Sequence, residues 1–148
     1  MKKIVIIACT VLLLAGCQSA TTGKESKVCN YDVGGTKMSY KLEADNDVLQ
    51  KIDVVEELSK SIIDEKALAE LTDEKKALIK KLALTQLGIE DDENITISFE
   101  AKEGVVVSTI SFDLTKLENF DLSKLGMGKS KKLSTALQAF KSAGIECN

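Results

Sequence analysis

Hydrophobic and polar side chains alternate along several stretches of the chain, and this pattern predicts β-strands. Between residues 36 and 43, Met38, Tyr40 and Leu42 alternate with lysine and serine. A period of two places the apolar side chains on one face of a half-buried strand. Strands are therefore predicted over residues 28–33, 36–43, 48–58, 95–101 and 106–114.

Apolar residues recur at three- and four-residue spacing between residues 59 and 87, which predicts one helix or two. Thr72 is a suitable N-cap inside this region. The side chains expected to form its apolar face are Leu78, Ile79, Leu82, Ala83 and Leu87. A last helix is predicted over residues 130–143, with Gly144 and Ile145 as its C-terminal cap. Its apolar stripe is Leu133, Ala136, Leu137 and Phe140.

The turns between the predicted strands favour antiparallel pairing. Residues 34–35 are two glycines, residues 44–47 are Ala-Asp-Asn-Asp, and residues 102–104 end in glycine. Glycine, asparagine and aspartate accept the backbone conformations that tight turns require. We therefore predict one α+β domain over residues 28–148, with an antiparallel sheet of two hairpins and helices packed on one face.

The first 16 residues have the order of a bacterial lipoprotein signal peptide. Two lysines precede an apolar run over residues 4–14, which is too short to span a bilayer comfortably. Leu14-Ala15-Gly16-Cys17 then resembles a lipobox, in which small residues let a signal peptidase approach the backbone and the cysteine thiol takes a diacylglycerol. Cys17 is therefore the expected lipid attachment site. An ordinary secretory signal is the alternative.

Residues 17–27 are expected to be the lipidated cysteine and a flexible tether. They are rich in serine, threonine, glycine and lysine and show no apolar periodicity. Two acyl chains on Cys17 would hold the protein stably at a bilayer. We therefore expect the domain on the extracytoplasmic face of the cell membrane, with the membrane as a partner through the lipid anchor.

The charged residues exclude some classes of function. All 20 basic residues are lysines, they stand against 23 acidic residues, and histidine is absent. Loss of Lys2 and Lys3 with the signal peptide would leave 18 lysines and a net charge of −5. Nucleic acid needs a basic face, so it is not an expected partner. Without histidine no Ser-His pair can form, and we expect no catalytic residues and no cofactor.

Two cysteines, Cys29 and Cys147, remain in the mature domain once Cys17 is acylated and Cys9 has left with the signal peptide. An even pair in an exported protein favours a disulfide, which here would join the two ends of the domain. Two free thiols are the alternative. A metal site is not expected, because zinc ligands cluster at short spacings and are commonly histidines.

Three polar segments have both a functional and a plain interpretation. The acidic residues 91–94 and 45–47 offer oxygen ligands for calcium, but neither has the spacing of a calcium loop, and we expect solvated turns. Lys129, Lys131 and Lys132 are expected on the exposed face of the terminal helix. Contact of these lysines with anionic lipid headgroups is the alternative.

Three short segments resemble the YehR-like family of bacterial lipoproteins. They are GTKMSYKLEADNDVLQK at residues 35–51, FDLTKL at 112–117 and ALQAFKSAGIE at 136–146. In that family the early hairpin starts with Gly-Thr and turns through a Gly-Asp pattern, whereas the turn here is Asp-Asn-Asp. The resemblance implies a lipid anchor and an α+β domain. It brings no established activity and no functional residues.

These observations together predict a membrane-anchored envelope lipoprotein that binds a protein or small ligand without catalysing a reaction. The open face of the sheet or its edge strands would make the contact. A structural or accessory subunit of an envelope or transport complex is the alternative. An apolar pocket between sheet and helices would favour a small ligand, and an uncovered apolar patch would favour a protein.

Overall fold

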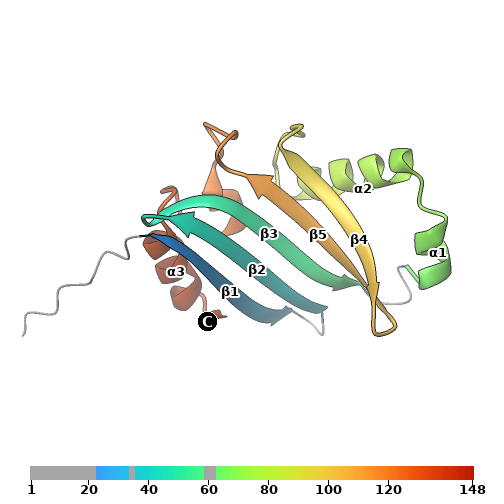
Figure 1. The fold of residues 1–148 in the computed structure, drawn as a ribbon, viewed down its shortest axis with the longest axis horizontal. Coiled ribbons are helices and arrows are strands. Elements are labelled where there is room, and N and C mark those ends of the chain that lie inside the picture. Colours follow the sequence, from blue (N-terminus) through green and yellow to red (C-terminus); the bar gives the residue numbers. More distant parts are fainter. Residues whose placement is uncertain (1–22, 34–35, 59–62) are drawn as a thin grey trace, which may run out of the picture.

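The computed structural model describes residues 23–33, 36–58 and 63–148. It contains a six-stranded antiparallel sheet in the order β4-β5-β3-β2-β1-β6, with helices against it (Figure 1). The strands are β1 (Lys24–Val33), β2 (Thr36–Asp45), β3 (Val48–Leu58), β4 (Ile95–Lys102), β5 (Val105–Asp113) and β6 (Glu146–Cys147). The helices are α1 (Glu65–Ala69), α2 (Asp73–Gln86), the 3-10 helix η1 (Leu122–Leu125) and α3 (Leu133–Ser142). The predicted α+β class is confirmed.

The sheet contains the two predicted hairpins, β2–β3 and β4–β5, and β1 extends the first of them into a three-stranded meander. Strands β1, β2 and β3 pair in sequence, and β4 pairs with β5. The two parts join through antiparallel pairing of β3 with β5, in which Ile52 lies opposite Phe112. Strand β6 pairs with β1 and escapes the sequence analysis, because its two residues are too few to show a period.

The first strand begins before the predicted start of the domain. The sequence pattern assigns residues 24–27 to the tether, but they pair with residues 42–45 of β2. They read Lys-Glu-Ser-Lys, so no alternation of apolar and polar residues marks them as a strand. The folded domain therefore includes Lys24. Residues 1–22, with the predicted signal peptide and Cys17, lie outside the described residues.

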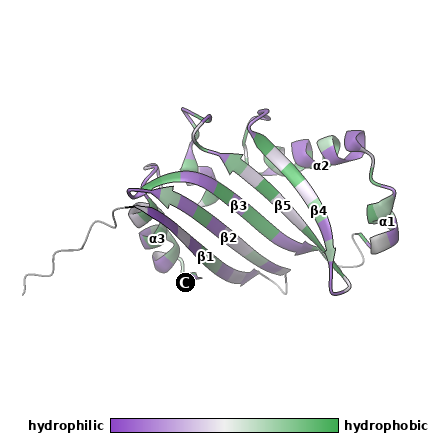
Figure 2. Ribbon diagram, viewed as in Figure 1, coloured by the Kyte–Doolittle hydropathy of each residue, from purple (hydrophilic) through white to green (hydrophobic). Residues whose placement is uncertain are grey.

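The hydrophobic core lies between the sheet and the segment that carries η1 and α3. Alternate strand residues point into it, and Figure 2 shows the matching bands of hydrophobic and hydrophilic positions along the strands. Ile52 and Phe112 are fully buried on the sheet side. Leu133, Ala136 and Phe140 of α3 are buried in the same core, so the apolar stripe predicted for the last helix is confirmed.

The end of α3 also follows its prediction. The helix closes at Ala143, and Gly144 adopts a φ of 77°, a left-handed conformation that suits glycine. The amide of Ile145 donates to the carbonyl of Phe140 at 2.9 Å, which satisfies an orphan carbonyl of the last turn. The Ile145 side chain packs against the core and completes the cap.

Helix α2 differs from its prediction in the face that it buries. Leu84 is buried and Ile79 and Ala83 are partly buried, but Leu78 and Leu82 are 58% and 57% exposed. The apolar residues of this helix cover too wide an arc for one contact, and α2 packs beside the edge strand β4. The prediction that Leu78 and Leu82 belong to the buried face is wrong.

Candidate functional site

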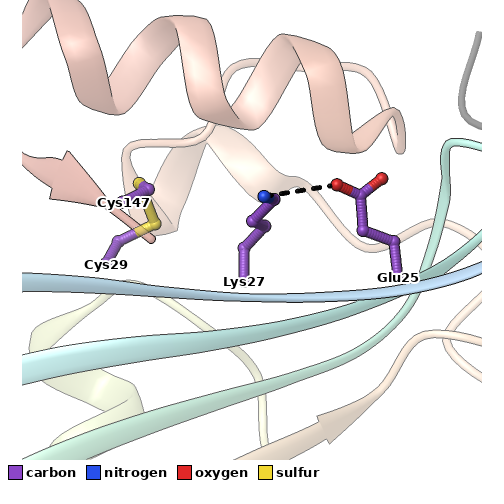
Figure 3. Close-up of a disulfide and its surroundings, with 4 residues drawn as sticks. All are labelled: Glu25, Lys27, Cys29 and Cys147. Carbon is purple, nitrogen blue, oxygen red and sulfur yellow. Dashed lines mark ion pairs between the residues drawn. A yellow bond between two sulfur atoms is a disulfide. The ribbon is translucent and has the colours of Figure 1, made fainter.

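A disulfide between Cys29 and Cys147 joins the two ends of the folded domain. The two sulfur atoms lie 2.07 Å apart, and the residues are 118 positions apart in the chain. Cys29 is fully buried in β1 and lies opposite Cys147 of β6. Figure 3 shows the disulfide on the same side of β1 as Lys27 and Glu25, whose charged groups lie 3.5 Å apart. The pairing expected from the cysteine count is therefore present in the structure.

The disulfide holds β6 over one edge of the sheet. Backbone hydrogen bonds run in both directions between Val28 and Asn148, at 3.1 and 2.9 Å. Together with the cysteine pair they close the middle of the β1 edge, where unpaired backbone groups would otherwise accept another strand. This edge, a predicted binding surface, is thus partly covered.

The opposite edge of the sheet, β4, has no described partner strand on its outer side. The carbonyl of Asn94 accepts from the amide of Asp113 in β5 at 3.1 Å, so the next residue turns its backbone groups outward. The carbonyl of Ile95 accordingly accepts from the ammonium group of Lys80 on α2 at 2.6 Å. Alternation leaves the backbone groups of Ile97 on the same outer edge.

Lysine ammonium groups hold the loops near the start of β4. Lys80 also donates to the carbonyl of Asp92 at 3.0 Å and lies 2.6 Å from the carboxylate of Asp91. Lys124 of η1 donates to the carbonyl of Gly88 at the end of α2. A charged donor shared among several oxygen acceptors is a strong interaction in a partly buried site. Lys80, with three such acceptors, therefore fixes the loop geometry and is not free to bind a ligand.

Lys131 has a similar role and differs from its prediction. Its ammonium group donates to the carbonyls of Leu114 and Leu117 at 3.2 and 2.6 Å, and its side chain is partly buried. The expectation that it lies on the exposed face of the last helix is wrong for this residue, because α3 starts after it. Lys129 and Lys132 are exposed, but they too precede α3, of which Lys132 is the N-cap, so their expected placement on the helix itself is also wrong.

A cleft of about 500 Å³ lies between the loop before β4 and the loop before η1. Its acidic lining residues are Glu90, Asp91, Asp92, Glu118 and Asp121. The carboxylate of Asp92 accepts from the amide and side-chain nitrogens of Asn94 at 2.7 and 2.8 Å. Hydrogen bonds from the hydroxyl and amide of Ser123 hold the pKa of Asp121 below its ordinary value.

These local bonds show why the acidic residues 91–94 act as a turn. The carboxylates of Asp91 and Asp92 are already used by neighbouring donors, the ammonium group of Lys80 and the nitrogens of Asn94. Among the described residues, no group of three cysteine, aspartate or glutamate side chains is arranged to hold a metal ion. The cleft is therefore a polar surface feature to which we assign no ligand.

The acidic turn at residues 45–47 has a structural use that its sequence does not reveal. Asn46 and Asp47 adopt φ values of 50° and 65°. The Asp47 carboxylate accepts from the amide and the hydroxyl of Ser134 in α3, both at 2.8 Å. These bonds lower the pKa of Asp47. The residue thus caps a helix 87 positions away, because Lys132 at the N-cap makes no side-chain cap bond.

The open face of the sheet carries a shallow groove of about 560 Å³. Val55 and Val107 form its floor, and Lys37 and Glu57 lie beside them with their charged groups 3.7 Å apart. Val107 is only 9% exposed although it lies on the open face. Most of the described residues that line this groove are charged or polar.

The most exposed large hydrophobic side chains of the described residues lie on α2. Leu78 and Leu82 are one helical turn apart, and Lys75 and Lys81 flank them on the helix surface. Helical spacing does not reveal this surface, because it predicts all the apolar residues of the helix on one buried face. The unusually wide apolar arc of α2 is the signal that could have identified it.

The pKa of one titratable group in the core, the phenol of Tyr40, is strongly raised. Burial raises the pKa of the Tyr40 phenol far above its ordinary value, and the neighbouring Tyr31 phenol raises it further. The rings of these two tyrosines stack with centroids 5.9 Å apart, and Phe140 lies 4.9 Å from Tyr40 on the α3 side. Tyr40 therefore stays protonated at neutral pH and contributes packing.

The described residues contain no helix long and apolar enough to cross a bilayer. Cys17, the expected lipid attachment site, lies outside them.

Comparison with known proteins supports the fold and does not identify a function. No family model matches the chain, and no curated protein matches it. The fold is similar to the NMR structure of the Escherichia coli YehR protein, with a TM-score of 0.53 and 14% identity over 85% of this chain and 91% of that chain. An NMR structure of a protein from Streptococcus pneumoniae TIGR4 aligns over 100% and 98% of the two chains, with a TM-score of 0.49 and 11% identity. The resemblance to YehR-like proteins is thus supported at the level of the fold.

Proposed function

We propose that this protein is a lipid-anchored envelope protein whose folded domain binds a partner protein and catalyses no reaction. The anchor is Cys17, and the apolar run and small residues before it support its acylation. The folded domain begins at Lys24, so a chain of six residues would link it to the acylated cysteine. The domain would then stay next to the extracytoplasmic surface of the membrane.

The exposed leucine pair on α2 carries the proposal of a protein partner. Leu78 and Leu82 leave 58% and 57% of their surface in water. Burial of that surface against a partner would contribute on the order of 1 kcal/mol for each side chain. The flanking Lys75 and Lys81 would form a polar rim around the apolar contact, as in many protein interfaces. An amphipathic helix of this kind fits an apolar groove on another protein.

A protein partner is favoured over an apolar small molecule by the lining of the two clefts described above. Most residues around both clefts are charged or polar, and neither cleft lies between the sheet and α3, where the core is filled. An apolar ligand would find no matching cavity there.

In-cell crosslinking from α2 tests the partner proposal. A photoreactive amino acid at position 78 is expected to capture one dominant envelope protein, whereas the same group at the exposed Lys102 is not. Leu82→Ser should reduce the capture from position 78 because it removes half of the apolar contact. Equal capture from both positions, or no effect of Leu82→Ser, would contradict the proposal. Capture of a transport-complex subunit would favour the accessory role.

Cell fractionation tests the anchor separately. Cys17→Ser should leave the precursor unprocessed or release the protein, because serine offers no thiol for diacylglycerol. The matched control is Ser19→Ala, a change in the tether that leaves the cysteine in place. Processing and membrane retention of Cys17→Ser equal to those of the control would refute the lipid anchor.

A further inference from the structure

The β2–β3 turn binds the start of the described chain. The amide of Gly23 donates to the side-chain oxygen of Asn46 at 3.0 Å, and the amide of Asn46 donates to the carbonyl of Gly23 at 3.0 Å. Two opposed hydrogen bonds fix where the chain enters the domain. Figure 1 shows the start of β1 beside this turn, at one end of the long axis.

The same turn also binds the start of α3. The carbonyl of Asp47 accepts from the amide of Leu133 at 2.9 Å, and its carboxylate accepts from Ser134. The amide of Leu49 donates to the carbonyl of Lys131 at 2.8 Å. Three chain segments therefore meet in one hydrogen-bonded end, which we call the anchor pole: residues 23–24, 45–49 and 129–134.

The anchor pole exposes three lysines and one apolar side chain. Val48 is 45% exposed. The exposed lysines are Lys24, Lys129 and Lys132.

The two carboxylates of the anchor pole, those of Asp45 and Asp47, accept local hydrogen bonds. Asp45 accepts from the side-chain nitrogen of Asn46 at 2.9 Å, and Asp47 accepts from Ser134. Lys132 and Lys129 also help to lower the pKa values of Asp47 and Asp121, respectively. The acidic groups at this end are thus partly balanced, although the domain as a whole is acidic.

We propose that the anchor pole rests on the anionic bilayer that holds the protein, with Val48 at the lipid interface and the lysines against phosphate headgroups. This inference rests on the proposed function, because it takes Cys17 as the acylated residue. Six residue steps separate Cys17 from Gly23, so the pole lies within about 20 Å of the acylated cysteine even with the chain fully extended. Lysine stems can cover apolar surface while their ammonium groups face headgroups.

The proposed orientation directs α2 away from the membrane. Figure 1 shows α1 and the start of α2 at the far end of the long axis from the β2–β3 turn. With the anchor pole on the bilayer, Leu78 and Leu82 would face a partner protein. The competing arrangement places these two leucines in the lipid and lifts Val48 away from it.

Fluorescence quenching separates the two arrangements. The probe is a thiol-reactive fluorophore on Val48→Cys or on Leu78→Cys, in the lipidated protein with its disulfide intact. The introduced cysteine is then the free thiol, because Cys29 is paired with Cys147. On phosphatidylglycerol-containing vesicles with brominated lipid, quenching at position 48 should exceed that at position 78 by at least about twofold. Equal or stronger quenching at position 78 would overturn the inference.

Lysine variants test the headgroup contact. Lys129→Gln with Lys132→Gln should lower the quenching at position 48 on anionic vesicles, whereas the matched pair Lys75→Gln with Lys81→Gln on α2 should not. All four lysines are exposed, so the variants are expected to fold. An equal effect of the two pairs would overturn the role of the anchor-pole lysines.

Vesicle flotation distinguishes failure of this inference from failure of the anchor. Lipidated protein that floats with vesicles but shows no quenching at position 48 retains the proposed function and overturns the orientation. Protein from cells that carries no lipid and does not float would remove the anchor itself, and the orientation with it.

Discussion

Reduction of the disulfide should lower the stability of the domain by a large and calculable amount. Cys29 and Cys147 close a loop with a sequence separation of 118 residues. In the chain-entropy description, that closure removes about 16 cal/mol/K from the unfolded chain, which is about 4.8 kcal/mol near room temperature. Native disulfides of small secreted domains contribute about 2–5 kcal/mol when measured, so we expect a value in the upper part of that range.

Other interactions near the disulfide are too weak to obscure this effect. The ion pair between Lys27 and Glu25 is partly exposed and contributes at most about 1 kcal/mol. After reduction, β6 keeps only a few backbone bonds worth about 1 kcal/mol each. Ordering its residues costs about 1–2 kcal/mol apiece, so β6 should detach from the edge of β1.

Urea unfolding of the soluble chain from Gln18 to Asn148, with and without reductant, measures the difference. The free energy of unfolding should fall by about 3–5 kcal/mol on reduction. Hydrogen exchange supplies a local readout: the amides of Val28 and Asn148 should lose protection while core amides of β3 keep theirs. A loss of stability below about 1 kcal/mol, or unchanged protection of Val28, would refute the reasoning.

Substitutions at four further positions have expected outcomes in the same unfolding assay. Asp47→Ala should cost about 1 kcal/mol because α3 loses its cap. Hydrogen bonds lower the pKa of Asp47 in the folded protein. The free energy of unfolding of wild type should therefore exceed that of Asp47→Asn at neutral pH, and the excess should shrink as pH falls below about 4. An excess that does not change with pH would contradict this. Lys80→Met should cost about 1–3 kcal/mol, because loop carbonyls and the Asp91 carboxylate lose their donor. Leu78→Ser should change stability by less than about 0.5 kcal/mol, whereas Leu84→Ala should cost about 3 kcal/mol; similar costs would contradict the burial of α2.

The strands could be predicted because a half-buried strand repeats every two residues. Met38, Tyr40 and Leu42 show this repeat, and their strand has the predicted neighbours on either side. Pairing between distant strands has no such local signal. The joining of β3 to β5 and the docking of β6 on β1 depend on contacts far apart in sequence, which no local periodicity encodes.

The same limit applies to the polar residues. The asparagine and aspartates of residues 45–47 predict a turn. They do not predict that Asp47 caps α3 through Ser134, because the two residues are 87 positions apart. Lys131 resembles any surface lysine in the sequence, yet its ammonium group satisfies two loop carbonyls. Side chains that serve distant backbone groups therefore escape analysis by spacing.

Helix α2 shows a different limit. The apolar spacing correctly predicts a helix, but the prediction of which face it buries is wrong. Spacing identifies the helix and its N-cap, Thr72, whose hydroxyl accepts from Lys75. Spacing does not say which part of a wide apolar arc meets the sheet. Packing beside an edge strand buries Leu84 and leaves Leu78 in solvent, and that choice belongs to the tertiary structure.

Mass spectrometry of the protein extracted from membranes tests the central claim most directly. The account predicts a mature chain that begins at Cys17 and carries a diacylglycerol on its thiol, with Cys29 and Cys147 resistant to alkylation until reduction. A mature chain that starts at another residue, or a Cys17 thiol that is free, would contradict the account of a lipid-anchored domain.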